Sequence, residues 1–138
     1  MDILKVCGCL REETAKINAI AAHNKNRKSF GEANFNKLFR AYIKHAKERK
    51  YPFFLTKEQF LILTSGNCYY CGIIPQQISN AMESYGAYIY NGVDRVDNFL
   101  GYSSDNCVSC CGVCNRAKDV MGIDVFLAWV KRIYKNRC

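Results

Sequence analysis

Two cysteine pairs constrain the fold of this chain more than any other feature of its sequence. Cys68 and Cys71 enclose two residues, and so do Cys111 and Cys114, while residues 72–110 separate the pairs. Two residues between thiolates let one tight turn present both sulfurs, and two such turns complete the tetrahedron that zinc prefers. Small buried cysteines and a redox-active pair are the alternative interpretations. We therefore predict a closed, structural zinc site, with a folded element between the two pairs.

The remaining cysteines give weaker signals. Cys107 and Cys110 form a third pair of the same spacing that overlaps the second, so Cys110 competes with Cys111 as a ligand. We prefer Cys111 because it keeps two residues to Cys114, which leaves Cys107 and Cys110 as core residues of a strand. Three further cysteines are expected to be free thiols, the first two with the alternative of a partner outside this chain: Cys7, Cys9 and Cys138.

The length and composition indicate one compact domain inside the cell. The chain has 138 residues, of which 49% are hydrophobic, and this is enough for one ordinary core. No run of about 18 apolar residues is present, and the first residues lack the pattern of a secretory signal. Nine cysteines in such a chain favour metal ligands or free thiols over disulfides. We expect an intracellular, cytoplasmic protein that does not bind membranes.

Positive charge is concentrated in one segment. The net charge is +8, and nine lysines and arginines between residues 25 and 50 face only two acidic residues there. Such a concentration favours a polyanionic partner, most commonly nucleic acid, although a solvated helix face is the alternative. Apolar residues at helical spacing predict an amphipathic helix over 35–50. Its basic side supplies the first candidate DNA-binding residues: Lys37, Arg40, Lys44 and Lys47.

The remaining helix and strand signals in the sequence predict an α+β fold. Thr56 and Gln59 suit a capping box for a helix over about 57–65, which stops at Gly66. A closing helix over 124–135 carries an apolar stripe that we expect to pack on the same core. Short strands are expected in the segment that follows Pro52 and near 86–90, 92–97 and 106–110.

These elements suggest where the domain begins. We assign residues 1–34 to a basic N-terminal extension, which includes a weakly periodic helix at 10–23. Residues 35–138 form the domain, with the basic helix first, a core region at about 66–121 and the closing helix last.

The central motifs resemble one known family. In order, the chain carries CYYCG from Cys68, NGVDRVDN from Asn91, GY, and DNCVSCCGVCNRAK from Asp105. This order is similar to the zinc-stapled branch of the HNH endonucleases, which are frequent in phages and other mobile elements. The resemblance covers roughly residues 35–134 and is strongest over 68–118. It implies a ββα-metal core between packed helices, double-stranded DNA as substrate, phosphodiester hydrolysis, and a location that includes the phage-infected host.

The resemblance also implies a role for each matching residue. Asp94 matches the aspartate that ligates the catalytic divalent ion, and Asn115 matches the second ligand. Oxygen donors of this kind suit Mg²⁺ or Mn²⁺. Asn106 matches the asparagine that ties the two strands together. Lys118 follows the second cysteine pair by one helical turn and would face the scissile phosphates, with Arg116 as a further DNA contact.

One position departs from the family. Arg95 stands where the general-base histidine is expected, and a guanidinium cannot accept a proton at neutral pH. We therefore expect Arg95 to bind phosphate oxygens and Asp97, two residues further on, to act as the base, unless the ion itself activates the water. The two histidines, His23 and His45, lie outside the motif.

Three alternatives remain beside this hypothesis. In the first, Asp94, Asp97 and Asn98 are simply turn residues before Gly101. Arg95 would then mark lost chemistry in a catalytically inactive zinc module that still binds nucleic acid. A small zinc adaptor that binds acidic proteins through its basic face is the third alternative.

Overall fold

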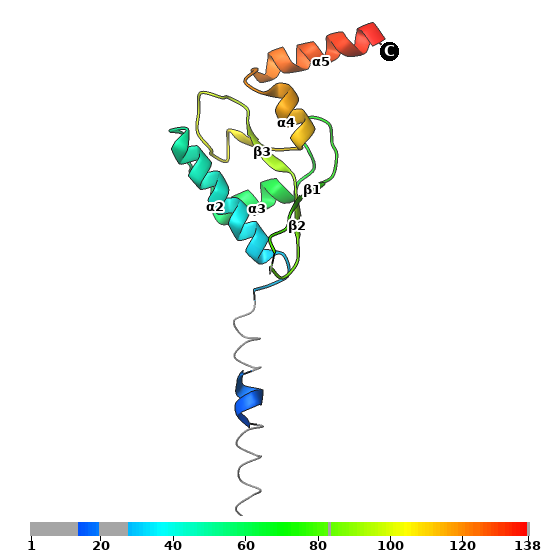
Figure 1. Cartoon of the computed structure of the whole chain (residues 1–138). Coiled ribbons are helices and arrows are strands. Elements are labelled where there is room, and N and C mark those ends of the chain that lie inside the picture. Colours follow the sequence, from blue (N-terminus) through cyan, green and yellow to red (C-terminus); the bar gives the residue numbers. More distant parts are fainter. Residues whose placement is uncertain (1–13, 20–27, 83, 138) are drawn as a thin grey trace, which may run out of the picture.

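The computed structural model describes residues 14–19, 28–82 and 84–137, and Figure 1 shows its elements. The fold is α+β, as predicted. Residues 14–19 are helical, and the helices described are all too short or too polar to span a lipid bilayer. The main body consists, in chain order, of α2 (Glu32–Glu48), α3 (Lys57–Ser65), β1 (Gln77–Ser79), β2 (Tyr88–Tyr90), β3 (Gly92–Arg95), β4 (Cys107–Cys110), α4 (Gly112–Lys118) and α5 (Ile123–Arg137).

The strands form two separate antiparallel pairs. In the β1–β2 pair Ile78 lies opposite Ile89, and in the β3–β4 pair Asp94 lies opposite Val108. Helix α4 begins directly after β4, so the chain forms a strand–strand–helix unit from Gly92 onwards. The predicted ββα order of this region is confirmed.

The hydrophobic core lies between α2, α3 and the strands. Phe60 of α3 is fully buried, and its ring centroid lies 6.0, 5.1 and 5.0 Å from those of Phe35, Phe39 and Tyr42 on α2. Aromatic pairs at these separations add to the stabilisation that their buried area provides. Val93 brings β3 to the same cluster. The site region is therefore built on a rigid aromatic core.

The first two helices have the predicted character. Helix α3 has the predicted bounds, because Thr56 Oγ1 accepts a hydrogen bond from Gln59 N at 3.1 Å and Gln59 Oε1 accepts one from Thr56 N at 2.9 Å. Helix α2 begins at Glu32, earlier than predicted, because Gly31 adopts a φ of 76° that ends the preceding turn. Ser29 N and Oγ both donate to Glu32 Oε2 at 2.9 Å and fix this first turn.

Several strand predictions need correction. Strand β3 ends at Arg95, before the predicted end at residue 97, because the next residues enter a hydrogen-bonded loop. Strand β1 was not predicted. The strand expected after Pro52 is only one isolated bridge, between Phe53 and Tyr102. Most of the predicted helix at 10–23 lies outside the described residues.

Helix α5 extends away from the body instead of packing on the core (Figure 1). Phe126 is its one buried residue, and its ring centroid lies 5.3 Å from that of Tyr70. The apolar stripe that we expected on the core is largely exposed, with Val125 at 61% and Ile133 at 44%. The expectation is wrong because the short connector at 119–122 starts α5 at the far end of α4, away from α2 and α3.

Candidate metal centre and the buried Asp94 site

Four cysteines come together where two tight turns meet. The sulfurs of Cys68, Cys71, Cys111 and Cys114 all lie within 4.8 Å of one another. The first two lie in a turn closed by hydrogen bonds from Gly72 N to Cys68 O and from Cys68 N to Ile73 O. Cys111 is the N-cap of α4, and its sulfur accepts a hydrogen bond from Cys114 N at 3.4 Å. The predicted clustering of the two pairs is confirmed.

The cluster has the dimensions of a tetrahedral thiolate site. Sulfurs at about 2.3 Å from a central zinc ion would be about 3.8 Å apart, from tetrahedral geometry. Cys71 Sγ and Cys111 Sγ are 3.7 Å apart. Burial raises the pKa of the Cys68 thiol, but the backbone N–H groups of Cys111, Cys71 and Tyr70 outweigh this and lower the pKa to about 6. A thiolate is therefore favoured at Cys68, whereas burial and the neighbouring thiols raise the pKa of Cys114, so a metal ion that binds here would displace protons from the cluster.

The competing cysteines of β4 take no part in the cluster. Cys110 is fully buried, and its thiol donates to the carbonyl oxygen of Cys111 at 3.5 Å. Burial raises the pKa of Cys107 to about 11 and raises that of Cys110 as well. Both therefore remain thiols in the core, as predicted, and Cys111 belongs to the cluster. Cys7, Cys9 and Cys138 lie outside the described residues.

Asp94 of β3 is buried beside this cluster. Its carboxylate accepts a hydrogen bond from Tyr70 Oη at 2.8 Å and pairs with Lys118 Nζ, which lies 3.2 Å from Oδ2. Lys118 also donates to Arg95 O at 3.1 Å. Burial, together with the hydrogen bond to the carboxylate, raises the pKa of Tyr70 well above its usual value. Asp94 is therefore a residue of the strand interior, and the turn alternative is wrong for it.

Lys118 does not face DNA phosphates as we expected. Its side chain is fully buried, and its ammonium is held by Asp94 and the β3 backbone. Lysine is buried to this extent only when its charge is paired. The sequence did not indicate the direction of this side chain, because its partner Asp94 lies on a different element.

Arg95 braces the loop that follows β3. Its Nη1 donates to Asn98 O at 3.0 Å and to Leu100 O at 2.7 Å. Its guanidinium carbon lies 3.6 Å from the ring centroid of Tyr51, which is a cation–π contact. These contacts turn the side chain towards its own loop, so the expected role of phosphate ligand does not fit its placement.

Asp97 and Asn106 close the same loop. Asp97 Oδ1 accepts a hydrogen bond from Phe99 N at 2.8 Å, a turn contact within an exposed segment. Asn106 Nδ2 donates to Asp97 O at 3.1 Å and to Gly101 O at 2.9 Å, while its Oδ1 accepts from Asp97 N at 2.9 Å. Asn106 therefore ties the end of β3 to the start of β4, whereas one oxygen of the expected base is already engaged in the turn.

The other expected site residues lie on the surfaces of α2 and α4. Asn115 is half-buried and lies one turn before Lys118, on the same side of α4. Arg116 is exposed. The predicted basic side of α2 is exposed at each of its candidate DNA-binding residues, which are Lys37, Arg40, Lys44 and Lys47.

Sequence reasoning missed several residues that organise this region. Tyr70 lies inside the first cysteine pair, so its position was visible, but its contact with Asp94 was not. Tyr51, directly before Pro52, supports Arg95 from a segment to which we assigned no role in the site. Asn91 is fully buried, and its Nδ2 donates to Gly66 O at 2.9 Å and to Ile73 O at 3.2 Å, which joins β3 to the cysteine turn.

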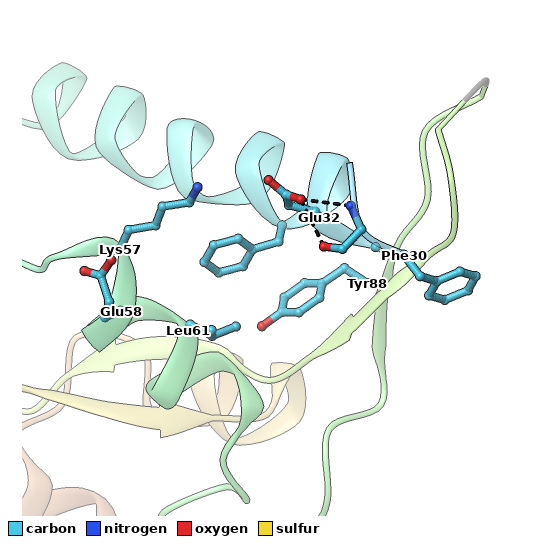
Figure 2. A pocket seen from close by; sticks show the side chains of 9 residues that line it. Phe30, Glu32, Lys57, Glu58, Leu61 and Tyr88 are labelled. Atoms are coloured by element: carbon cyan, nitrogen blue, oxygen red, sulfur yellow. Dashed lines mark hydrogen bonds between the residues drawn. The ribbon is translucent and has the colours of Figure 1, made fainter. Parts of the chain in front are cut away.

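A separate hollow of about 350 Å³ lies between the first turns of α2 and α3 and strand β2 (Figure 2). Its walls include Glu32, Lys57, Leu61 and Tyr88. None of the residues of the cysteine cluster or the Asp94 site lines this hollow, so it is separate from both.

No family model matches the chain. An uncharacterized protein of Acanthamoeba polyphaga mimivirus, R423, is 36% identical over 86 residues, which is 62% of this chain but 14% of that protein. The chain thus corresponds to a small part of that relative. A solved structure of the rare-cutting HNH restriction endonuclease PacI is similar with 24% identity and a TM-score of 0.49, over 71% of this chain and 80% of that one.

Proposed function

We propose that this chain is a metal-dependent endonuclease of the HNH type that cleaves DNA phosphodiester bonds and carries a structural zinc ion. The observation that supports this most is the burial of Asp94 between β3 and α4, beside the four-cysteine cluster. A buried carboxylate at the junction of two strands and a helix is a candidate ligand for a cation, and in this structure Lys118 supplies that cation. The ββα order and the exposed lysines of α2 support the same proposal.

Zinc is proposed at Cys68, Cys71, Cys111 and Cys114. The sulfur separations and the lowered pKa of Cys68 fit a closed tetrahedral site, which has no open position for substrate. Because the ligands lie in the turn after α3 and at the start of α4, the ion would hold α4 against β3 and β4. Its role would be to hold the backbone that carries Asp94 and Asn115 in place.

A second divalent ion, Mg²⁺ or Mn²⁺, is proposed at Asp94 and Asn115. A carboxylate and an amide oxygen are suitable donors for such ions, and Asp94 offers a buried carboxylate. In this structure the ammonium of Lys118 occupies the place of a cation at the carboxylate, so the ion would bind Asp94 only if this ammonium were displaced. When bound, such an ion supplies charge stabilisation at a phosphoryl group.

The remaining residues bind and position DNA in this proposal. Lys37, Arg40, Lys44 and Lys47 on α2, with Arg116 on α4, contact the phosphate backbone. Asp97 is exposed and has a second carboxylate oxygen beyond the one that caps Phe99 N, so it remains our candidate to accept the proton of the attacking water. Arg95 positions Asp97 by holding its loop.

Incubation of supercoiled plasmid with zinc-loaded protein and Mg²⁺ or Mn²⁺ tests this proposal. Nicking or cutting that depends on the added ion, and that is lost in Asp94→Asn and Asn115→Ala, is the expected result. Asp94→Asn keeps a hydrogen-bonding group beside Lys118 but leaves this ammonium buried without its counter-charge. Circular dichroism and the zinc content of this variant must therefore match those of the wild type before its loss of cleavage counts as a loss of metal binding. Glu58→Gln, an exposed acidic residue of α3, is the matched control and should cleave normally. The absence of metal-dependent cleavage by the wild type would contradict the nuclease proposal.

A second candidate function has its own supporting observation. Lys118 neutralises Asp94, and Arg95 is used within its loop, which is the arrangement expected of a zinc module that binds nucleic acid without cutting it. Fluorescence anisotropy with labelled duplex DNA at increasing salt separates the candidates. Salt-sensitive binding without cleavage favours the module, and the absence of salt-sensitive binding favours a protein-binding adaptor.

A further inference from the structure

The loop between β3 and β4 presents an aromatic ring to solvent. Phe99 is 94% exposed and its neighbour Leu100 is 54% exposed, although both follow a strand that is buried up to Asp94. Single apolar residues on a surface are common and need no explanation by themselves. Phe99 and Leu100 differ from such residues because hydrogen bonds fix the loop that carries them.

Four side chains hold the loop around Phe99. Arg95 donates to the carbonyl oxygens on both sides of Phe99, at Asn98 and Leu100, and Asp97 accepts from Phe99 N. Asn98 Nδ2 donates to Val120 O at 3.0 Å and to Met121 O at 3.3 Å, which ties the loop to the connector before α5. Asn106 closes the base of the loop. The loop that carries the ring is therefore already ordered before binding, so binding costs little further conformational entropy.

The surroundings of this loop suit nucleic acid. Its base lies against the end of α2, since Tyr102 N donates to Pro52 O at 2.9 Å and Tyr51 lies beneath Arg95. The adjoining end of α2 is positively charged and exposed, with Lys44, Lys47, Arg49 and Lys50 against Glu48. A protruding ring beside phosphate-binding groups is the arrangement with which proteins unstack bases.

A hollow of about 390 Å³ lies on one side of Phe99. Its walls are apolar at Val96, Val120 and Ile123, and its polar groups include the carboxylates of Asp97 and Asp124. Carboxylates repel phosphate but accept hydrogen bonds from the amino groups of bases. The lining therefore suits a displaced base better than a phosphate group.

We propose that Phe99 is a wedge that inserts between base pairs of duplex DNA, next to the site of Asp94, and unstacks one base step on binding. The side chains of Arg95, Asp97, Asn98 and Asn106 position it. This proposal rests on the DNA binding in the proposed function but not on cleavage. Insertion takes place when the duplex binds, so it requires no divalent ion.

Duplexes that contain 2-aminopurine test the wedge, because the fluorescence of this base rises when it is unstacked. A set of duplexes with the probe at successive positions is mixed with full-length, zinc-loaded protein in buffer without Mg²⁺ or Mn²⁺. We expect a rise at one or two adjacent positions. Phe99→Ala should abolish this rise and weaken binding about 5- to 150-fold, the range for the loss of one base–aromatic stack. Phe99→Trp should retain it.

Phe54→Ala is the matched control, because Phe54 is 71% exposed on a neighbouring segment that belongs to no helix or named strand. It should bind and unstack DNA like the wild type. A fluorescence rise that persists in Phe99→Ala, or that is absent when the wild type binds, overturns the wedge. Circular dichroism of each variant excludes misfolding. Unstacking by a protein that never cleaves DNA would leave the wedge standing while the nuclease proposal fails, and no binding by the wild type would end both.

Discussion

At the scale of single residues, Lys118 is the most completely buried charged side chain among the described residues. Its ammonium is removed from water and is compensated by Asp94 and by the carbonyl oxygen of Arg95. Taking both charges out of water offsets much of their mutual attraction. The pair therefore fixes α4 relative to β3 but adds little to the free energy of unfolding. Removal of either partner alone would leave a buried charge without a counter-charge.

Removal of one partner alone should be strongly destabilising. We expect Lys118→Met to lower the free energy of unfolding by about 3–5 kcal/mol, because it leaves Asp94 buried without a cation. Urea denaturation in the presence of zinc measures this effect. The double variant Asp94→Asn with Lys118→Met should recover much of the loss, since no buried charge remains. A single variant as stable as the wild type would show that water reaches Asp94.

Arg95 allows a second prediction at this scale. Arg95→Lys keeps the positive charge but replaces the planar group that lies over Tyr51 and binds two carbonyl oxygens. We expect it to lower the free energy of unfolding by about 1–2 kcal/mol, close to the effect of Arg95→Ala. The exposed Arg116→Lys should change stability by less than about 0.5 kcal/mol. If Arg95→Lys were as neutral as Arg116→Lys, the bracing role would be wrong.

At the scale of elements, α3 is the helix whose limits depend most clearly on local sequence. The reciprocal hydrogen bonds between Thr56 and Gln59 fix its start. We expect Thr56→Ala to lower the free energy of unfolding by about 0.5–2 kcal/mol, the usual cost of a lost N-cap. Chemical denaturation measures it, with the exposed Ser104→Ala as control. An unchanged midpoint for Thr56→Ala would mean that packing of Phe60 alone defines the helix.

Elements that depend on neighbouring residues could be predicted from the sequence, and those that depend on distant ones could not. The α3 capping box and the amphipathic face of α2 follow from residues three or four apart. The docking of α5 depends on the direction in which the connector leaves α4, which no periodicity encodes. Strand β1 is short and pairs with β2 across a long connection, so it left no pattern in the sequence.

The same division applies to the candidate site. The four clustered cysteines were predictable because each pair lies within one turn. The choice of Cys111 over Cys110 followed from spacing alone. The contacts of Lys118 and Tyr70 with Asp94 each join residues 24 positions apart in the sequence. Whether a lysine faces solvent or a carboxylate so far away in the sequence depends on tertiary packing, which local patterns do not encode. Arg95 was recognised as unusual, but its partners in the loop were not.

At the scale of the whole molecule, the cysteine cluster connects the turn after α3 to the start of α4. Chelation of the bound metal should therefore lower the melting temperature by about 10 °C or more and reduce the helical signal. Circular dichroism with and without EDTA measures both, and a colorimetric assay of released zinc should give one ion per chain. A melting curve insensitive to EDTA in a protein that releases zinc would contradict this role.

Two cysteine variants make this prediction specific. Cys71→Ser should release zinc and reproduce the effect of EDTA, because Cys71 belongs to the cluster. Cys107→Ala should keep the metal, because this buried thiol lies in β4 outside the cluster. Retention of the metal by Cys71→Ser would mean that another thiol, such as that of Cys110, completes the site.

Cys111 is both a member of the cluster and the N-cap of α4. One side chain thus serves metal binding and helix initiation, and α4 in turn carries Lys118 to Asp94. In a newly synthesised chain these events would be coupled, so that the Asp94 site matures only after zinc has been acquired. If the proposed function holds, the supply of zinc would then set the moment at which each copy becomes competent to cut DNA.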